Sequence, residues 1–458
     1  MQTLIYRIKN YRLPSLALIF ICLLPVMDIK SQDIQPINLE TVLRLCGANN
    51  LTIQEYKQQQ ELAIANIAKA KEWWLPHVYA GIQTHQLWGA AMNADGRFFL
   101  DVDRSNLWLG LGLEAHWDFA GGIYETKAAI LKAEAALYQT QAERNKVLLE
   151  SIDAYYDFAA AQMDFQAYQL LAAQADTISR QIDIQVQSGI LYESELLLSK
   201  SSLNHLKIQM LHAKVEYAKK SAVLVRLLDL DPSLKLVNVD STLSPLNLFT
   251  EDELVNVGIK IDSAYQNRPE FAAMTLNLNS LEVEKKTITT GLLIPELWLN
   301  TYGSYFGELS GQVRPMLPAQ YPETKQLYPT GSLNVSLMWK IPLGRLIYTG
   351  DLKHFNSRIL IAQTQKEQLR TKVNEEILAA REALTIAKEQ MKIAFEGSQF
   401  AGEALQQSIQ RQELGTVRPY EILQVQEIFI KIKLDYIKAV SDYNKAQYAL
   451  LVATGENL

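Results

Sequence analysis

The side chains best placed to do chemistry in this 458-residue chain are carboxylates near two helix reversals. Helical patterns end at Gly189 and Gly415, and five acidic residues flank these glycines: Asp183, Glu193, Glu195, Glu413 and Glu421. If several copies of a chain surround one opening, rings of carboxylates can gate it or select cations. The solvated face of a helix is the simpler interpretation of the same residues.

The remaining titratable residues do not form a catalytic pattern. His205 and His212 are seven residues apart on a predicted helix, without a carboxylate at ligand spacing. The segment 110–112, Gly-Leu-Gly, is no dinucleotide loop, because a strand continues where a helix would be required. With 44 basic and 50 acidic residues, the chain lacks a basic footprint for nucleic acid. We therefore expect no enzyme activity, no metal site, no cofactor and no nucleic-acid partner.

The first 31 residues have the features of a signal peptide. Basic residues precede the short apolar run Leu13–Met27, and a cleavage site follows near Ser31. An uncleaved anchor and lipidation at Cys22 are the alternatives. Removal of this leader would leave Cys46 as the single cysteine, which excludes an intrachain disulfide. The sequence after the leader has no run of eighteen apolar residues, so it predicts no transmembrane helix.

The rest of the chain contains the same pattern of elements twice. Each half has a helix that ends in an apolar residue and proline, then two alternating runs, then a helical stretch of about sixty residues that ends at a glycine. We predict a first repeat over 32–230, a linker over 231–250 and a second repeat over 251–458. A duplicated unit of this kind is more typical of transport proteins or scaffolds than of enzymes.

The alternating runs predict four strands, at about 76–88, 106–119, 295–306 and 331–342. Residues 89–105 and 307–330 would then be long loops. In the second and fourth runs leucines alternate with polar residues, as in a membrane β-strand, although a soluble sheet with one wet face produces the same pattern. In a membrane, the polar side would line a water-filled path: Gly110, Gly112, Glu114, His116, Asp118, Asn334, Ser336 and Lys340.

Four strands cannot close a barrel. Open edges in hydrocarbon would leave unpaired backbone groups at several kcal/mol each. A membrane location therefore requires several copies to pool their strands, eight from two chains or twelve from three.

The long helical stretches predict coiled-coil hairpins over 123–228 and 350–454. The seam of the second follows Val373, Ala380 and Ala387, interleaved with Ile377 and Leu384. The corresponding seam of the first repeat would contain these residues: Leu149, Tyr156, Met163, Leu170, Thr177 and Ile184, interleaved with Ile152, Ala159, Gln166, Ala173 and Arg180. Gly189 and Gly415 suit left-handed C-terminal caps, and Pro419 suits the first turn of a return helix.

Taken in order, these points resemble the TolC-type outer-membrane efflux family over residues 38–455. The resemblance rests on five doubled elements. They are Asn49-Asn50-Leu51 and Asn267-Arg268-Pro269-Glu270; Leu75-Pro76 and Ile294-Pro295; Trp117-Asp118-Phe119-Ala120-Gly121-Gly122 and Ile341-Pro342-Leu343-Gly344; Gly189-Ile190-Leu191 and Gly415-Thr416-Val417; and Glu195-Leu196-Leu197 and Glu421-Ile422-Leu423.

The resemblance implies a mainly α-helical homotrimer with a twelve-stranded barrel in the outer membrane and a helical tunnel in the periplasm. It also implies docking of a periplasmic adaptor, coupled to an inner-membrane pump, at the helical tips: Gly189, Ile190, Leu191, Gly415, Thr416 and Val417. Helix capping alone also explains the glycines.

The expected function is a passive exit duct for small molecules. Alternatives are the outer-membrane duct of a protein-secretion system, or, in another class, a periplasmic coiled-coil adaptor or structural protein. An adaptor would carry one hairpin between compact β-domains rather than a duplication.

Overall fold

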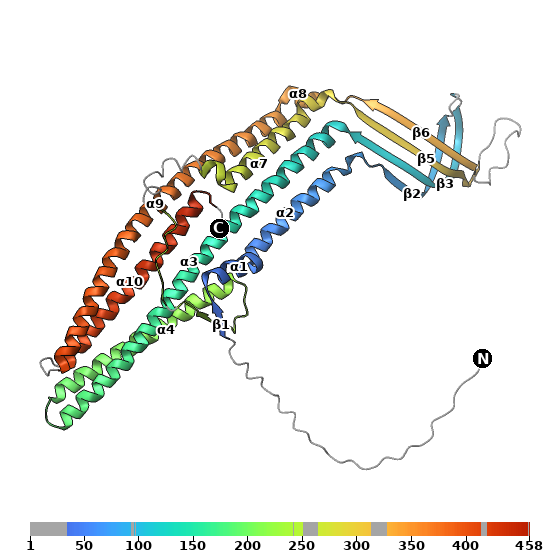
Figure 1. Cartoon of the computed structure of the whole chain (residues 1–458). Coiled ribbons are helices and arrows are strands. Elements are labelled where there is room, and N and C mark those ends of the chain that lie inside the picture. The colour runs from blue at the N-terminus through green and yellow to red at the C-terminus, as the bar shows by residue number, and fades with distance from the viewer. Residues whose placement is uncertain are drawn as a thin grey trace, which may run out of the picture.

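The chain is long and narrow in the computed structural model, with a curled β-sheet at one end and helix reversals at the other (Figure 1). The structure describes residues 34–92, 96, 98–240, 242–250, 264–312, 328–413, 419–456 and 458. The predicted leader, including Cys22, lies outside these residues, as do Gly415, Thr416 and Val417 and most of the predicted loop over 307–330.

Two runs of elements follow one another in the same order. The first run contains α1 (Leu39–Asn49), α2 (Leu51–Ala70), the 3₁₀ turn η1 (Glu72–Trp74), β2 (His77–Met92), β3 (Phe98–Asp118), α3 (Phe119–Gln187) and α4 (Glu193–Leu227). The second contains α7 (Pro269–Lys285), η2 (Lys286–Ile288), η3 (Thr290–Leu293), β5 (Glu296–Gln312), β6 (Tyr328–Met338), α8 (Leu343–Tyr348), α9 (Gly350–Glu413) and α10 (Pro419–Ala453). The first copy passes directly from β3 into α3, whereas the second copy has additional residues between β6 and α9, and the short helix α8 lies among them.

The four long strands form one antiparallel sheet in the order β2-β3-β5-β6. The strands extend beyond the predicted ones, since β2 continues to Met92 and β3 begins at Phe98. The expectation of a long loop over 89–105 was therefore wrong. The 21 residues of β3 span about 70 Å, more than the roughly 30 Å of a bilayer core, so polar residues continue the strand into water. Conversely, β6 ends at Met338 rather than 342, because its partner β5 begins at Glu296, opposite Met338.

The register gives this sheet two distinct faces. The apolar face carries large side chains that are exposed in the single chain, among them Val78 (75%), Ile82 (71%), Leu111 (63%) and Leu333 (70%). Ile82 is opposite Leu109, and Leu299 is opposite Val335, so this face is continuous across the strands. The polar face carries the predicted pore-lining residues of β3 and β6.

The junction between sheet and helices is fixed by a helix cap. The Asp118 carboxylate accepts a hydrogen bond of 2.9 Å from the Gly121 backbone N–H at the start of α3. Gly122 leaves room for the Trp73 ring, which a Cβ at this position would approach to 2.1 Å. The Trp73 ring also packs edge-on against Phe119, with centroids 5.7 Å apart. These contacts fix the direction in which α3 leaves the sheet.

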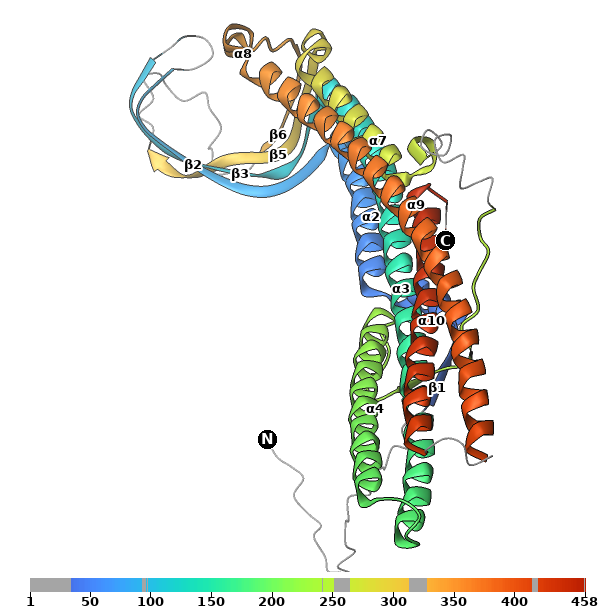
Figure 2. The same ribbon diagram turned by 90° about the vertical axis from the view of Figure 1, so that its left-hand side faces the viewer.

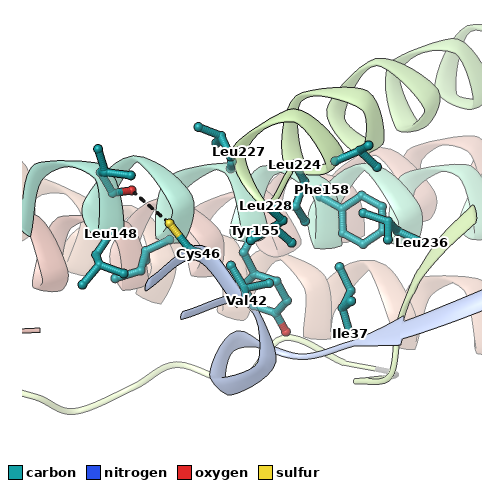
Figure 3. Close-up of a cluster of buried hydrophobic side chains, with 14 of the residues drawn as sticks. Ile37, Val42, Cys46, Leu148, Tyr155, Phe158, Leu224, Leu227, Leu228 and Leu236 are labelled. Carbon is teal, nitrogen blue, oxygen red and sulfur yellow. Dashed lines mark hydrogen bonds between the residues drawn. The ribbon is translucent and has the colours of Figure 1, made fainter. Parts of the chain in front are cut away.

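The main hydrophobic core lies at mid-length, where α1, α3 and α4 meet a small two-stranded sheet (Figure 3). This sheet pairs β1 (Ile34–Ile37) in parallel with β4 (Lys235–Asn238) and was not predicted. Cys46, Phe158 and Leu236 are fully buried in this core. Burial raises the pKa of the Cys46 thiol, which accords with a small apolar residue rather than a reactive one.

The segment between the repeats is attached to α10 through its backbone. The Asn444 Oδ1 atom accepts a hydrogen bond of 2.8 Å from the Leu246 N–H, and the Gln447 Oε1 atom accepts one of 2.7 Å from the Leu248 N–H. Both amide groups also donate to linker carbonyls at 2.9 to 3.0 Å. The side chains of Asn444 and Gln447 thus supply hydrogen-bond partners to the backbone groups of the linker, as a neighbouring strand would.

The coiled-coil seam of α9 is confirmed, because Val373, Ile377 and Leu384 are buried. The seam predicted for α3 is wrong in its lower half. Leu170 is 58% exposed and Ile184 is 64% exposed, whereas Leu171 and Ile182 are buried against α4 and α10. A helix with 3.6 residues per turn drifts from a strict seven-residue repeat, so over 69 residues the buried face rotates.

The two faces of the sheet predict opposite responses to a new charge. Leu109→Asp and Val335→Asp would each place a carboxylate on the apolar face, which is destabilising in hydrocarbon, although by less than the roughly 2–4 kcal/mol of a basic side chain. We expect both variants to reduce assembly into membranes, measured as the membrane-inserted fraction. Ser336→Asp, next to Val335 but on the polar face, is the control and is expected to assemble normally. Equal loss in all three variants would contradict the assignment of the faces.

Candidate functional site

The predicted pore-lining residues gather on the polar face of the sheet. Backbone pairing places Glu114 opposite Asn300, which is itself opposite Asn334. His116 and Ser336 flank Trp298 in the next row. The Ser336 hydroxyl donates to the Asn334 side-chain oxygen at 3.1 Å. Asp118 lies at the end of the same face, where its carboxylate is used as the cap of α3.

A charged cluster at the helix-proximal end of this face was not predicted. The Glu296 carboxylate lies 2.9 Å from His116 Nε2 and 2.6 Å from Lys340 Nζ, so it joins β3 and β5 to the segment after β6. The His116 ring stacks on Trp298 with centroids 3.8 Å apart, and Lys340 lies 4.9 Å from the centre of the Trp298 ring. Glu296 directly follows Ile294-Pro295, and its position at a strand entry was the available signal.

The first helix reversal has the geometry of an exposed, rigid corner. Gly189 has a φ of +74°, which L-residues with a side chain rarely adopt. The Ile190 N–H donates to the Gln185 carbonyl and the Gly189 N–H to the Val186 carbonyl, both at 2.9 Å, which is a Schellman motif. Ile190 is 71% exposed and Tyr192 is 80% exposed. The predicted cap is confirmed, and it presents apolar side chains to solvent.

The predicted carboxylates near the tips are distributed around the helix ends. Glu193 and Glu195 occupy the first turn of α4, where negative charge suits the positive end of the helix dipole. Glu193 and Glu421 are exposed, whereas Asp183 and Glu195 are half-buried. The Glu413 side chain lies outside the described part of the chain. Within one chain, these positions give no closed ring.

An ion-pair cluster higher up joins both repeats. The Asp157 carboxylate of α3 accepts hydrogen bonds from Lys220 of α4 at 2.6 Å and from Lys445 of α10 at 2.8 Å. Lys445 also contacts Asp442 at 2.8 Å. Burial works against the charged form of Asp157, but the two lysines outweigh it, and the pKa of Asp157 lies below its ordinary value.

Two other carboxyl groups of α3 have pKa values above the ordinary value. Burial raises the pKa of Asp153 to about 6, opposed by the charge of Lys445. Burial likewise raises the pKa of Asp164 to about 6, opposed by Lys438. Lys445 and Lys438, which act on these three aspartates, both belong to α10, which runs beside α3 (Figure 2).

The described residues contain no cluster of three or more histidine, cysteine, aspartate or glutamate side chains that could hold a metal ion. None of the helices in the same residues combines the length and the apolar character needed to cross a membrane.

Comparison with known proteins relates the first repeat to a family of known role. Residues 42–229 match the outer membrane efflux protein family. No curated protein matches the chain significantly in sequence.

Solved structures share the fold at low sequence identity. The CmeC outer membrane channel of Campylobacter jejuni is 16% identical and has a TM-score of 0.73, over 91% of this chain and 85% of that one. The outer membrane protein VceC of Vibrio cholerae is 13% identical with a TM-score of 0.68, over 92% and 96% of the two chains. The open state of the MtrE outer membrane channel of Neisseria gonorrhoeae is 14% identical with a TM-score of 0.67, over 92% and 89%.

The tip geometry predicts a specific effect of Gly189→Val. A β-branched residue at a φ of +74° costs about 1–2 kcal/mol and opens the reversal locally. The strain is confined to the tip, so we expect the oligomer to persist while export through the protein falls. Oligomer mobility in mild detergent and cellular accumulation of an exported compound measure the two effects. Gly47→Val, at a helical glycine with open space around it, is the control. Loss of the oligomer itself would mean that Gly189 is needed only for folding.

The aspartates of α3 predict opposite signs for two matched amide substitutions. The pKa of Asp164, about 6, lies above the unfolded value of about 4, so the cost of its buried charge is complete above pH 6 and disappears as the pH falls to 4. Asp164→Asn should therefore raise the free energy of unfolding at pH 8 by about 1 kcal/mol, a value already reduced for solvent screening of the charge. At pH 4 it should leave the free energy of unfolding unchanged.

Asp157→Asn serves as the counterpart. It removes the partner of two lysines and should lower stability at pH 8 by about 1–3 kcal/mol. Because the pKa of Asp157 is depressed, this difference should shrink only as the pH falls below about 4. Thermal unfolding at both pH values measures both variants. Shifts of the same sign at pH 8 would contradict the assignment.

Proposed function

We propose that the chain, whose residues 42–229 match the outer membrane efflux protein family, is the exit duct of a tripartite efflux system. In this proposal it carries small molecules passively across the outer membrane after an inner-membrane pump and a periplasmic adaptor have moved them. The four strands lie in the outer membrane and the long helices extend into the periplasm, as in the channels of this fold.

The observation that carries the proposal is the sheet itself. Its apolar face is exposed, its opposite face is polar, and its outer strands β2 and β6 each have one unpaired edge in the single chain. In hydrocarbon such edges must be paired. Three copies pairing β6 of one chain with β2 of the next would give a closed twelve-stranded barrel with apolar residues outside and polar residues inside.

The helices supply the rest of the path. Three copies of the α3–α4 and α9–α10 hairpins would continue the barrel as a tunnel. The proposed contacts for the adaptor are Gly189, the exposed Ile190 and the half-buried Leu191 at the first reversal, with Gly415, Thr416 and Val417 of the predicted second reversal. The carboxylates of Asp183, Glu193, Glu195, Glu413 and Glu421 would come together around the tunnel mouth only in the trimer.

The proposal predicts a trimer in the outer membrane. Separation of the two membranes by density should place the protein with the outer membrane. On gels it should run as a trimer without heating and as a monomer after boiling, because twelve paired strands resist detergent. An exported soluble protein is the control for contamination between fractions. A soluble monomer in the periplasm would contradict the proposal.

A further inference from the structure

Aromatic rings are concentrated on the polar face, where the duct would meet water. Tyr79 of β2, Trp108 of β3, and Trp298 and Tyr302 of β5 all belong to this face by the pairing register. All four side chains are half-buried, so part of each ring remains accessible in the single chain.

The rings are held in fixed positions by small neighbours. Trp108 and Tyr302 contact each other edge to face, with centroids 5.4 Å apart. Between them in the sheet lie Gly110 and Ser304, and Ser304 is only 6% exposed, which indicates that the two rings cover it. The neighbouring Tyr79 ring occupies the space above Gly112, where a Cβ would lie 2.1 Å from the ring. Because the rings are already ordered, binding a flat molecule would cost little side-chain entropy.

The charge beside these rings is negative. Glu114 is exposed on the same face, two residues along β3 from Gly112 and thus one row from Tyr79 and Tyr302. The positive charge of Lys340 is already paired with Glu296 at 2.6 Å. Lys340 also lies 4.9 Å from the centre of Trp298, so an aromatic ring of this face already receives a cation from within the protein.

We propose that Trp108 and Tyr302, together with Tyr79 and Glu114, form a weak contact site for planar aromatic cations in passage. The rings provide stacking and cation–π attraction, and the carboxylate favours positive charge. This site rests on the proposed duct and adds to it a preferred class of solute.

The test separates this role from a purely structural one, in which the rings only cover glycine and serine. In the double variant Trp108→Leu/Tyr302→Leu, smaller apolar side chains still lie over Gly110 and Ser304, while the π-faces are removed. Tyr305→Leu is the matched control. Tyr305 is on β5, like Tyr302, but it lies on the apolar face, where it is 54% exposed. Ion current through each purified protein in a planar bilayer is recorded with increasing N-methylquinolinium, a planar aromatic cation, or tetraethylammonium, a cation without a ring.

We expect N-methylquinolinium to reduce the wild-type current at lower concentration than tetraethylammonium does. Its half-blocking concentration should rise about three- to tenfold in the double variant, as expected for two rings, and remain unchanged in Tyr305→Leu. Unblocked currents equal to the wild type would show that the double variant is folded. An unchanged half-blocking concentration with normal current would overturn the aromatic site alone. Absence of current in the wild type would overturn the duct and the site together.

Discussion

The constraint on which the whole structure depends is the hydrogen bonding of the strand backbones at the two edges of the sheet. Within one chain, β3 and β5 are paired on both sides, whereas β2 and β6 each have one free side. Water can satisfy these groups, but hydrocarbon cannot. The exposed apolar face is stable in contact with lipid. The free strand edges of a single chain are not stable there, because their backbone groups would have no hydrogen-bond partners. Both conditions would be met if copies paired edge to edge, so we expect membrane insertion and oligomer formation to be coupled.

The helical part meets a different requirement. A wall of long helices has little core of its own, and here its cohesion comes from contacts between the two repeats. Asp157 joins α3 and α4 to α10, and Asn444 and Gln447 of α10 bind the backbone of the linker. The main core adds β1 and β4 to this level of the molecule. The mid-length region therefore fixes the two hairpins to each other, and a second apolar cluster, which includes Ile182, Leu196 and Ile422, joins α3, α4 and α10 nearer the first reversal.

Local signals in the sequence were sufficient for most of the fold. Period-two alternation predicted the strand faces, and Gly189 predicted the reversal, because both depend on residues close in sequence. The lower seam of α3 was mispredicted because a seven-residue repeat does not report which neighbour a helix meets along its length. The cluster of Glu296 with His116 and Lys340 joins residues up to 180 positions apart. The strand entry after Pro295 marks the position of Glu296, but only the strand register shows which residues it meets.

The length of β3 has a consequence beyond transport. Even a strand tilted by about 45° with a length near 70 Å covers roughly 50 Å along the bilayer normal, well beyond the apolar layer. Its distal half, with β2 and β5 alongside, would stand clear of the lipid as a rigid collar on the outside of the cell. Such a collar would be accessible to large molecules outside the cell, whereas the wall within the lipid would not.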